Sequence, residues 1–217
     1  MASKKTVIIF SILITYSISL LATDFEGRII LSKQSLYDTT IYEYTVKENH
    51  VRIDIKNPQA QIVQSLIIDL EEESITALSP NLRLYTTLKK NSYAKDYDKA
   101  EYELIKTPNF KLINGYKCFL WHVRNKRQDS DITFWITELK FDFLPKVVAL
   151  LSRTDDYNEI INYYIQIELD NNFFPMLIID RTLLQEEKSK LMVTDILNEP
   201  VSDKAFEISK DYKLLRY

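Results

Sequence analysis

The chain has 217 residues, of which 46% are hydrophobic and 27% are charged, and its formal net charge at pH 7 is −3. A chain of this length and apolar content can bury a substantial core, and it fits one domain better than two. The negative charge argues against a nucleic-acid-binding protein, because neutralising phosphates requires a clustered basic surface and the basic residues here are scattered among acids.

The first residues have the layout of a secretory signal peptide. Lys4 and Lys5 precede an almost unbroken apolar run over residues 6–21, and Ala22 is followed at once by charged residues. The run is slightly short for a membrane-spanning helix, which needs about 20 apolar residues. We therefore expect export of the protein to the periplasm or the medium.

Cleavage is expected after Ala22, which leaves a mature domain of residues 23–217 without a membrane-spanning segment. Leu20 is bulkier than the small residue typical of the position three before a cleavage site, so an uncleaved anchor is the alternative. Residues 1–22 contain two lysines and no acid, so their removal lowers the formal net charge from −3 to −5.

The first half of the mature domain is predicted to form an antiparallel meander. Its clearest alternation of apolar and polar residues runs from Val51 to Lys56, which predicts a strand with one buried and one solvent-exposed face. Asn57-Pro58 ends this strand. Short polar turns separate the other strands, and consecutive strands joined by short turns usually pair with each other. The strands predicted here span residues 25–31, 42–46, 51–56, 62–70, 74–78 and 82–88.

Residues 110–138 are predicted to form two consecutive hairpins. Asn114-Gly115 is the strongest hairpin signal in the chain, because a tight primed turn requires positive φ at both central residues and Asn and Gly adopt it at least cost. The strand over residues 116–124 has two largely apolar faces, so we expect it inside the sheet and between two covering layers. The strands predicted in this region span residues 101–106, 110–113, 116–124 and 131–138.

After the hairpins, apolar residues recur at three- and four-residue intervals, with Pro145 placed to open a helix and Asp155 or Asp156 to cap its second half. This pattern predicts one covering helix over residues 145–164, broken near Arg153. We expect its apolar face to pack on the sheet rather than to lie on a membrane surface. The remaining chain is predicted to contain strands over residues 173–181 and 189–197 and a short helical turn over residues 202–206.

The sequence lacks the motifs of catalysis and cofactor binding: it has no glycine-rich phosphate loop, paired-histidine metal motif or serine-elbow motif. Only His50 and His122 could act as bases near neutral pH. His122 lies four residues from Cys118 in one predicted strand, more than about 12 Å away and too far to form a thiolate pair. Cys118 is expected to be a small buried hydrophobe rather than a nucleophile or redox thiol. We expect no enzyme activity, cofactor or metal site.

Short motifs with a characteristic order and spacing are distributed over nearly the whole mature chain. They are Phe25-Glu26-Gly27, Val51-Arg52-Ile53-Asp54, Ile67-Ile68-Asp69-Leu70, Tyr85, Asn114-Gly115-Tyr116-Lys117-Cys118, Trp135-Ile136-Thr137-Glu138 and Phe174-Pro175-Met176. Together they resemble an uncharacterised family of exported bacterial proteins with a fold similar to that of the outer-membrane lipoprotein carrier and receptor, the LolA/LolB type. The resemblance implies a mainly β (α+β) fold, in which a curled antiparallel sheet forms an incomplete barrel with a covering helix.

Carriers of that fold shelter acyl chains in the concavity of the sheet, so the resemblance implies an exported cell-envelope protein that binds a lipid or a lipoprotein acyl chain. The alternative is a non-catalytic structural or partner-binding envelope module, which has a filled core and binds another envelope protein. Under the first hypothesis we expect an apolar ligand site between the sheet and the helix of residues 145–164, where Ile53→Glu should weaken binding without unfolding the protein. The residues expected to line this site are Phe25, Ile29, Tyr44, Ile53, Trp121 and Trp135.

Overall fold

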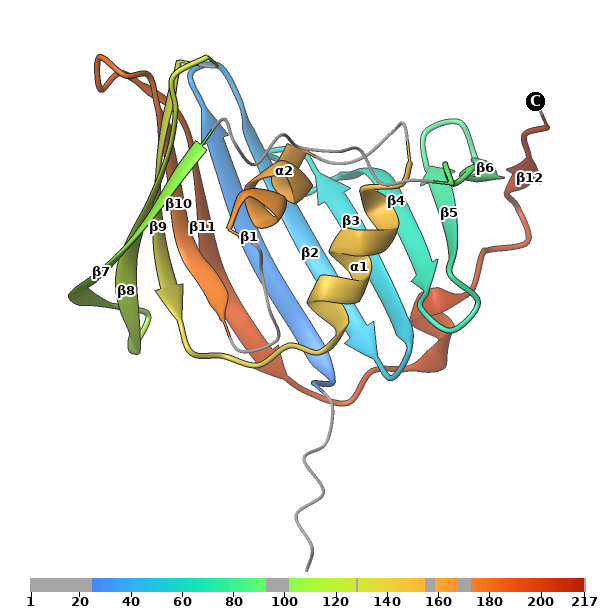
Figure 1. Ribbon diagram of the computed structural model, residues 1–217. Coiled ribbons are helices and arrows are strands. Elements are labelled where there is room, and N and C mark those ends of the chain that lie inside the picture. The colour runs from blue at the N-terminus through green and yellow to red at the C-terminus, as the bar shows by residue number, and fades with distance from the viewer. Residues whose placement is uncertain (1–24, 93–101, 128, 155–158, 168–172, 217) are drawn as a thin grey trace, which may run out of the picture.

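The computed structural model describes residues 25–92, 102–127, 129–154, 159–167 and 173–216. Two short α-helices, α1 (Phe143–Leu151) and α2 (Glu159–Gln166), lie on one face of a large sheet (Figure 1). We call this face the inner face. The strands are β1 (Gly27–Ser35), β2 (Thr39–Lys47), β3 (His50–Lys56), β4 (Ile62–Asp69), β5 (Ser74–Ser79), β6 (Leu84–Thr87), β7 (Tyr102–Ile113), β8 (Tyr116–Asn125), β9 (Ser130–Thr137), β10 (Phe174–Arg181), β11 (Glu187–Asn198) and β12 (Lys213–Leu214).

The described residues form one 12-stranded sheet with the order β12-β6-β5-β4-β3-β2-β1-β11-β10-β9-β8-β7. Neighbouring strands are antiparallel, except that β12 pairs in parallel with β6. The edge strands β7 and β12 do not pair with each other, so the sheet does not close into a barrel. This arrangement confirms the predicted class, a mainly β fold with an incomplete barrel.

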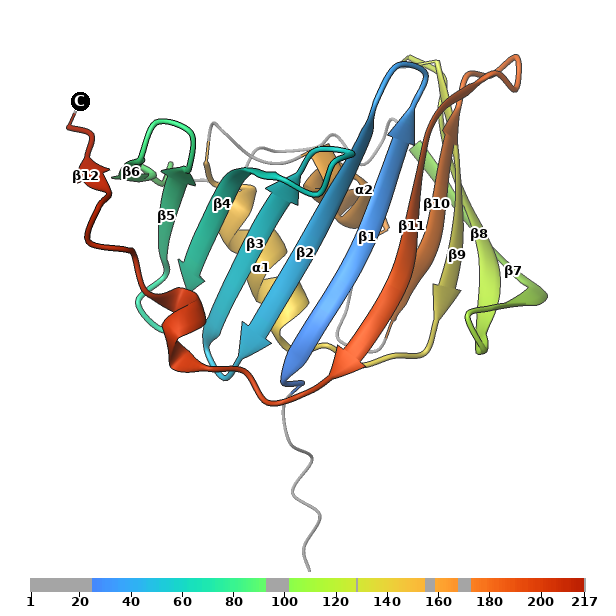
Figure 2. The same cartoon turned by 180° about the vertical axis from the view of Figure 1, so that it is seen from behind.

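The sheet consists of two meanders, β1–β6 and β7–β11, that meet where β1 pairs with β11 (Figure 2). Gly27 begins β1 at this junction with φ of +148°. A Cβ atom at Gly27 would lie 1.9 Å from the carbonyl oxygen of Leu197 on β11. Glycine is therefore required here both by the backbone conformation and by the close approach of the other meander.

The hairpin predicted at Asn114-Gly115 is confirmed. Asn114 has φ of 50° and Gly115 has φ of 83°, and the two residues connect β7 to β8. The two short strands predicted before this turn are parts of one strand, β7, whose pairing with β8 is irregular between Lys106 and Phe110. Pro108 lies in that interval and has no N–H to donate to a neighbouring strand. The partner strand β8 lies inside the sheet between β7 and β9, as predicted.

The predicted break in the covering helix near Arg153 is confirmed, because α1 ends at Leu151 and α2 begins at Glu159. α1 begins at Phe143, two residues before the expected Pro145. The predicted caps at residues 155 and 156 lie outside the described residues.

A polar group on the inner face fixes α2 to the sheet. The hydroxyl of Tyr163 on α2 lies 2.9 Å from the hydroxyl of Ser189 on β11 and donates to a carboxylate oxygen of Asp180 on β10 at 3.4 Å. Ser130 on β9 donates to the other oxygen of Asp180 at 3.0 Å. Burial raises the pKa of Tyr163 to about 12, so its hydroxyl remains a hydrogen-bond donor at neutral pH.

On the opposite, outer face, the chain after β11 contains a short 3₁₀ helix, η2 (Asp203–Phe206), which confirms the helical turn predicted there. The guanidinium of Arg52 on β3 donates to the carbonyl oxygen of Ala205 in η2 at 3.0 Å and to a carboxylate oxygen of Asp54 at 2.8 Å. These contacts hold the C-terminal segment against β3 before it reaches β12, a strand that the sequence analysis did not predict.

Candidate functional site

The inner face beneath α1 and α2 is filled with side chains. Ile29, Tyr44 and Ile53, three of the six residues predicted to line a ligand site, are buried in one cluster with Val147 and Leu151 of α1. The hydroxyl of Tyr44 has no hydrogen-bond partner in the described part of the chain, and burial raises its pKa well above the ordinary value. These three residues therefore form core in the structure.

The burial of Ile53 corrects one expectation. Its side chain is 0% exposed, so a glutamate at this position would place an unpaired charge in the core. Burying such a charge is unfavourable enough to disrupt packing. Ile53→Glu is therefore not a binding variant that leaves the fold intact.

Phe25 closes one end of this interior. Its ring makes an edge-on contact with Phe141 at 4.9 Å between centroids and stacks on Phe143 at 6.1 Å. Phe141 in turn contacts Phe174 edge-on at 4.8 Å. The predicted Phe25 thus packs between the start of β1 and the start of α1, among aromatic rings that fill the space.

The two tryptophans lie on opposite faces of the sheet. Trp121 on β8 is opposite Phe134 on β9, whereas Trp135 on β9 is opposite Leu120. Because directly opposed residues share a face and successive residues alternate, Trp121 lies on the inner face and Trp135 on the outer face. The structure therefore does not bring Trp135 together with the other five predicted residues.

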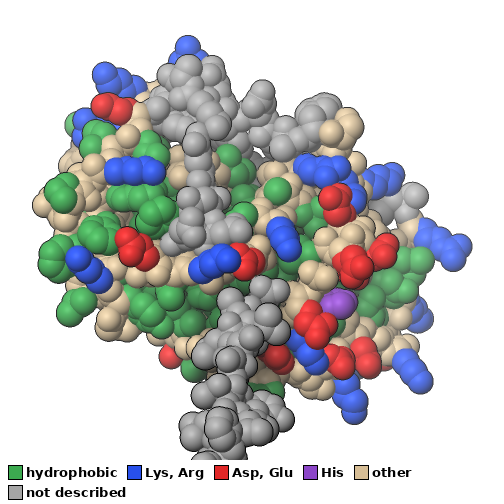
Figure 3. Space-filling view, turned by 60° about the horizontal axis from the view of Figure 1, so that its bottom comes forward, with side chains coloured by type: hydrophobic (Ala, Val, Ile, Leu, Met, Phe, Trp, Pro, Cys, Tyr) green, Lys and Arg blue, Asp and Glu red, His purple; other side chains and the backbone are tan. Residues whose placement is uncertain are grey.

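On the part of the inner face formed by β7 and β8, apolar side chains extend to solvent. Phe110 is opposite Phe119, and Leu112 lies on the same face two residues further along β7. Phe110 is 59% exposed and Leu112 is 70% exposed, whereas the neighbouring Trp121 is buried. We call Phe110, Leu112, Phe119 and Trp121 the apolar wall. Hydrophobic side chains gather on the side of the molecule where β7 and β8 lie (Figure 3).

Lysine ammonium groups lie over the rings of the apolar wall. The Nζ atom of Lys106 is 4.0 Å from the ring centroid of Trp121. The Nζ atom of Lys117 is 4.5 Å from the centroid of Phe110 and 4.9 Å from that of Phe119. These distances are typical of cation–π contacts, in which the positive group is attracted by the face of the ring.

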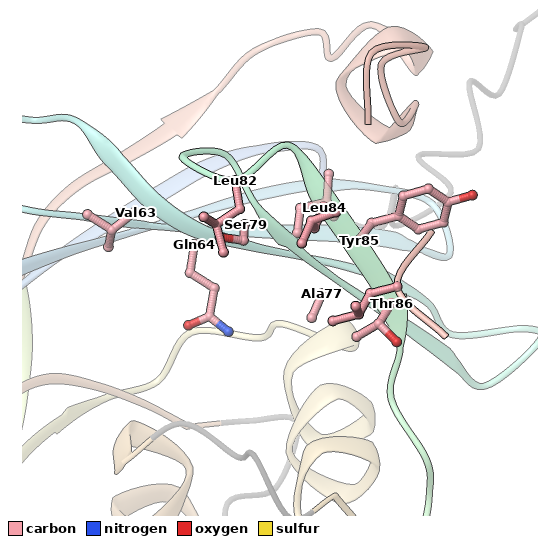
Figure 4. Close-up of a pocket in the computed structure, with 10 residues that line it drawn as sticks. Val63, Gln64, Ala77, Ser79, Leu82, Leu84, Tyr85 and Thr86 are labelled. Carbon is pink, nitrogen blue, oxygen red and sulfur yellow. The ribbon is translucent and has the colours of Figure 1, made fainter. Parts of the chain in front are cut away.

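A hollow of about 390 Å³ lies at the opposite end of the sheet from the apolar wall, around β4, β5 and β6 (Figure 4). Gln64 and Thr86 point from the strands toward the side that carries the helices. The hollow is formed by β4–β6, the turn between β5 and β6, and Leu215 next to β12, whereas no residue of α1 or α2 lines it. Its lining residues are Val63, Gln64, Ala77, Leu78, Ser79, Leu82, Leu84, Tyr85, Thr86 and Leu215.

In the part of the chain that the structure describes, the groups with acid–base or nucleophilic chemistry are not brought together in one site. Cys118 is buried, as predicted, and burial raises the pKa of its thiol. His50 lies 3.6 Å from a carboxylate oxygen of Asp69, and His122 lies 3.9 Å from one of Asp131. Among the described residues there is no group of three side chains that could hold a metal ion.

In the part of the chain that the structure describes, no helix is long and apolar enough to cross a membrane. The predicted signal peptide, residues 1–22, lies outside the described residues, so its cleavage remains a prediction.

Residues 25–212 match a family model described as a domain of unknown function, DUF4412. The chain belongs to the DUF4412 family. This match confirms the resemblance to an uncharacterised family, and the unclosed antiparallel sheet with helices on its inner face agrees with the carrier-like fold that the resemblance implied. A search of curated proteins found no match.

Among solved structures, the DUF4412 chain is similar to an uncharacterised conserved protein from Thermus thermophilus, with 8% sequence identity and a TM-score of 0.52 over 88% of this chain and 91% of that chain. At this identity the likeness concerns the fold alone.

Two further structures align less closely. One is a DUF1329 family protein from Desulfovibrio piger, with 11% identity and a TM-score of 0.33 over 83% of this chain and 88% of that chain. The other is described as an outer membrane lipoprotein-sorting protein domain from Vibrio parahaemolyticus, with 9% identity and a TM-score of 0.31 over 83% and 89%. TM-scores this low do not indicate a shared function.

Sequence reasoning identified only Trp121 of the apolar wall in this DUF4412 protein. The alternation of Lys117, Phe119 and Trp121 along one strand was a usable signal for β8, because these residues share a face. The same alternation places Phe110 and Leu112 on one face of β7. That this face is the one of Phe119 and Trp121 depends on the register between β7 and β8, and the exposure of the two side chains depends on how far α1 and α2 extend.

Proposed function

We propose that this protein is an exported, non-catalytic envelope protein that binds an apolar ligand, such as a lipid or a lipoprotein acyl chain, against the apolar wall of β7 and β8. The observation that carries the proposal is the exposure of Phe110 and Leu112 on the inner face, next to the buried Trp121. Contiguous apolar surface of this kind is uncommon on monomeric proteins and usually marks a site of interaction.

The energy for binding would come from removing apolar surface from water. Burial contributes about 25 cal/mol per Å², so an acyl chain laid on the rings would gain several kcal/mol without any buried charge. The apolar run over residues 6–21, preceded by two lysines, supports export. The absence of catalytic motifs from the sequence supports a binding role rather than an enzymatic one.

The filled interior favours the alternative function. Ile29, Tyr44 and Ile53 pack against the helices, so the part of the inner face that was expected to hold a ligand is core. Under this alternative the protein is a structural or partner-binding module, and the apolar wall contacts another protein of the envelope.

The proposal can be tested by titrating the delipidated mature protein with a fatty acid or an apolar dye and following tryptophan emission. We expect a saturable shift that Trp121→Phe removes and Trp135→Phe retains, because only Trp121 lies on the face of the apolar wall. Co-purified lipid, detected by native mass spectrometry, would support the same conclusion.

Two variants of β7 provide a matched pair for this titration. Leu112→Glu should weaken binding, since it places a charge on the apolar wall. Ile105→Glu should not, because Ile105 is 41% exposed and lies opposite His122 on the outer face. Unchanged emission over a range of chain lengths, with no co-purified lipid, would favour the structural-module alternative.

A further inference from the structure

We propose that the ligand of the apolar wall is an anionic amphiphile: an acyl chain that packs on the rings and ends in a carboxylate or phosphate group, which Lys106 and Lys117 bind. This inference rests on the proposed function, and it adds the charge of the ligand and the residues that recognise it.

Both lysines are part of the same face as the rings. Lys106 is directly opposite Trp121, and Lys117 is directly opposite Leu112. Trp121 is four positions after Lys117 on β8, which is about 13 Å at the rise of a β-strand. Phe110 and Phe119 lie between these two positions. An acyl chain on the rings would therefore have an ammonium group near either end.

The two lysines also differ from others in the protein. Lys56 lies 2.6 Å from a carboxylate oxygen of Glu43, and Lys140 lies 3.3 Å from one of Asp142. In the described part of the chain, neither Lys106 nor Lys117 has a carboxylate within salt-bridge distance; their described partners are aromatic rings. The chain as a whole is acidic, so two cations whose described partners are aromatic rings of an apolar surface match a ligand that combines an apolar chain with a negative charge.

The chemistry of the two contacts explains how the lysines would respond to a ligand. An ammonium group over an exposed ring is held weakly. It can move along the edge of the ring to a carboxylate or phosphate oxygen, where a charge-assisted hydrogen bond is stronger than a neutral one. A neutral head group of the same size gains no such bond. Discrimination between charged and neutral head groups of about tenfold is therefore expected.

The test compares ligands with one acyl chain and different head groups, each below its aggregation concentration. Palmitate and lysophosphatidylglycerol carry the carboxylate and phosphate forms of the charge, and monopalmitoylglycerol is neutral. With the mature protein we expect at least one anionic ligand to bind about tenfold more tightly than the neutral one. The difference should shrink at high salt, because salt screens exposed charges. Whichever anionic ligand binds more tightly identifies the head group.

Substitutions then assign the effect to the lysines. Lys106→Gln and Lys117→Gln should each weaken binding of the anionic ligand several-fold and leave binding of monopalmitoylglycerol unchanged. Lys111→Gln is the matched control, since Lys111 lies on the outer face of the same hairpin with its Nζ atom 4.1 Å from the ring centroid of Trp135. It should alter neither affinity. Circular dichroism should show the same fold for all three variants.

The possible failures are distinguishable. Equal affinity for charged and neutral ligands, or lysine variants that bind palmitate and lysophosphatidylglycerol like the wild type, would overturn the inference and leave the proposed apolar binding intact. Failure of all three ligands to bind the wild-type protein would overturn both.

Discussion

On the inner face of the sheet, β1–β4 and β7–β8 differ in what covers their apolar side chains. Ile53 on β3 and Ile68 on β4 are both 0% exposed and belong to the same buried cluster as α1 and α2. On β7, Phe110 and Leu112 are mostly exposed. The same pattern of alternating apolar residues therefore produces core in one region and surface in the other, and the difference lies in the covering elements rather than in the strands.

Simple dimensions explain why the cover is incomplete. Helices of nine and eight residues, α1 and α2, are each about 12 to 14 Å long. Twelve strands at a spacing of about 4.8 Å form a sheet more than 50 Å wide. Two such helices cannot shield the whole inner face, and the region of β7 and β8 is among the parts that retain exposed apolar side chains. A ligand site is expected where the strands supply apolar surface that the helices do not bury.

Placing a charge in the covered region, β1–β4 beneath the helices, is expected to change the stability of the protein most. Ile53→Glu should lower the free energy of unfolding by more than about 4 kcal/mol, because the carboxylate would be buried without a partner. Ile105→Glu, on an exposed position of β7, should change it by less than about 0.5 kcal/mol. Urea unfolding of both variants is the measurement. A cooperatively folded Ile53→Glu protein with near wild-type stability would show that the covered region is not close-packed.

A smaller loss of stability is expected from shortening a buried apolar side chain. Leu151→Ala on α1 should cost about 2 to 5 kcal/mol, since Leu151 is fully buried and its truncation leaves a cavity. Leu112→Ala should have little effect on stability and should weaken binding of the apolar ligand. Thermal unfolding and the tryptophan titration, performed on both variants, separate the two roles. Similar stability losses for the two leucines would contradict the division of the inner face.

Local patterns in the sequence were sufficient to predict much of the fold. The alternation from Val51 to Lys56 identifies β3, and Asn114-Gly115 identifies the hairpin of β7 and β8. The helical spacing with a break near Arg153 identifies α1 and α2. Each of these features depends on residues close in the chain, for which turn chemistry and side-chain periodicity are reliable guides.

Features that depend on residues far apart were not predictable. Nothing local indicates that β1 pairs with β11, which places Ile29 opposite Ile196 across the junction of the two meanders. Trp121 and Trp135 lie on opposite faces because of the register between β8 and β9. A register shift of one residue would place both tryptophans on the same face. The ligand site predicted beneath the helix required knowledge of how completely α1 and α2 fill that space, which depends on packing across the whole sheet.

The smallest expected effect on stability concerns Asp180. This residue lies on β10, in the meander β7–β11, and accepts a hydrogen bond from Tyr163 of α2. Burial raises the pKa of its carboxyl group, and this outweighs the hydrogen bonds from Ser130 and Tyr163 and the attraction of Lys188 and Lys33, which lower it. The folded protein therefore holds the proton on Asp180 at a higher pH than the unfolded chain does. The contribution of this group to stability is fully present below its ordinary pKa and is lost as the pH rises through the folded value.

Asp180→Asn isolates this contribution, because the amide is neutral at every pH and keeps an oxygen that can accept the hydrogen bond from Ser130 or Tyr163. The difference in unfolding free energy between wild type and variant should favour the wild type more at pH 3.5 than at pH 7, when each is measured by urea unfolding at both values. Asp38→Asn, at an exposed turn between β1 and β2, is the control for exchanging a carboxylate for an amide outside the covered region. The same difference for Asp180→Asn at both pH values would mean that water reaches the carboxylate, and the covered region would then end before β10.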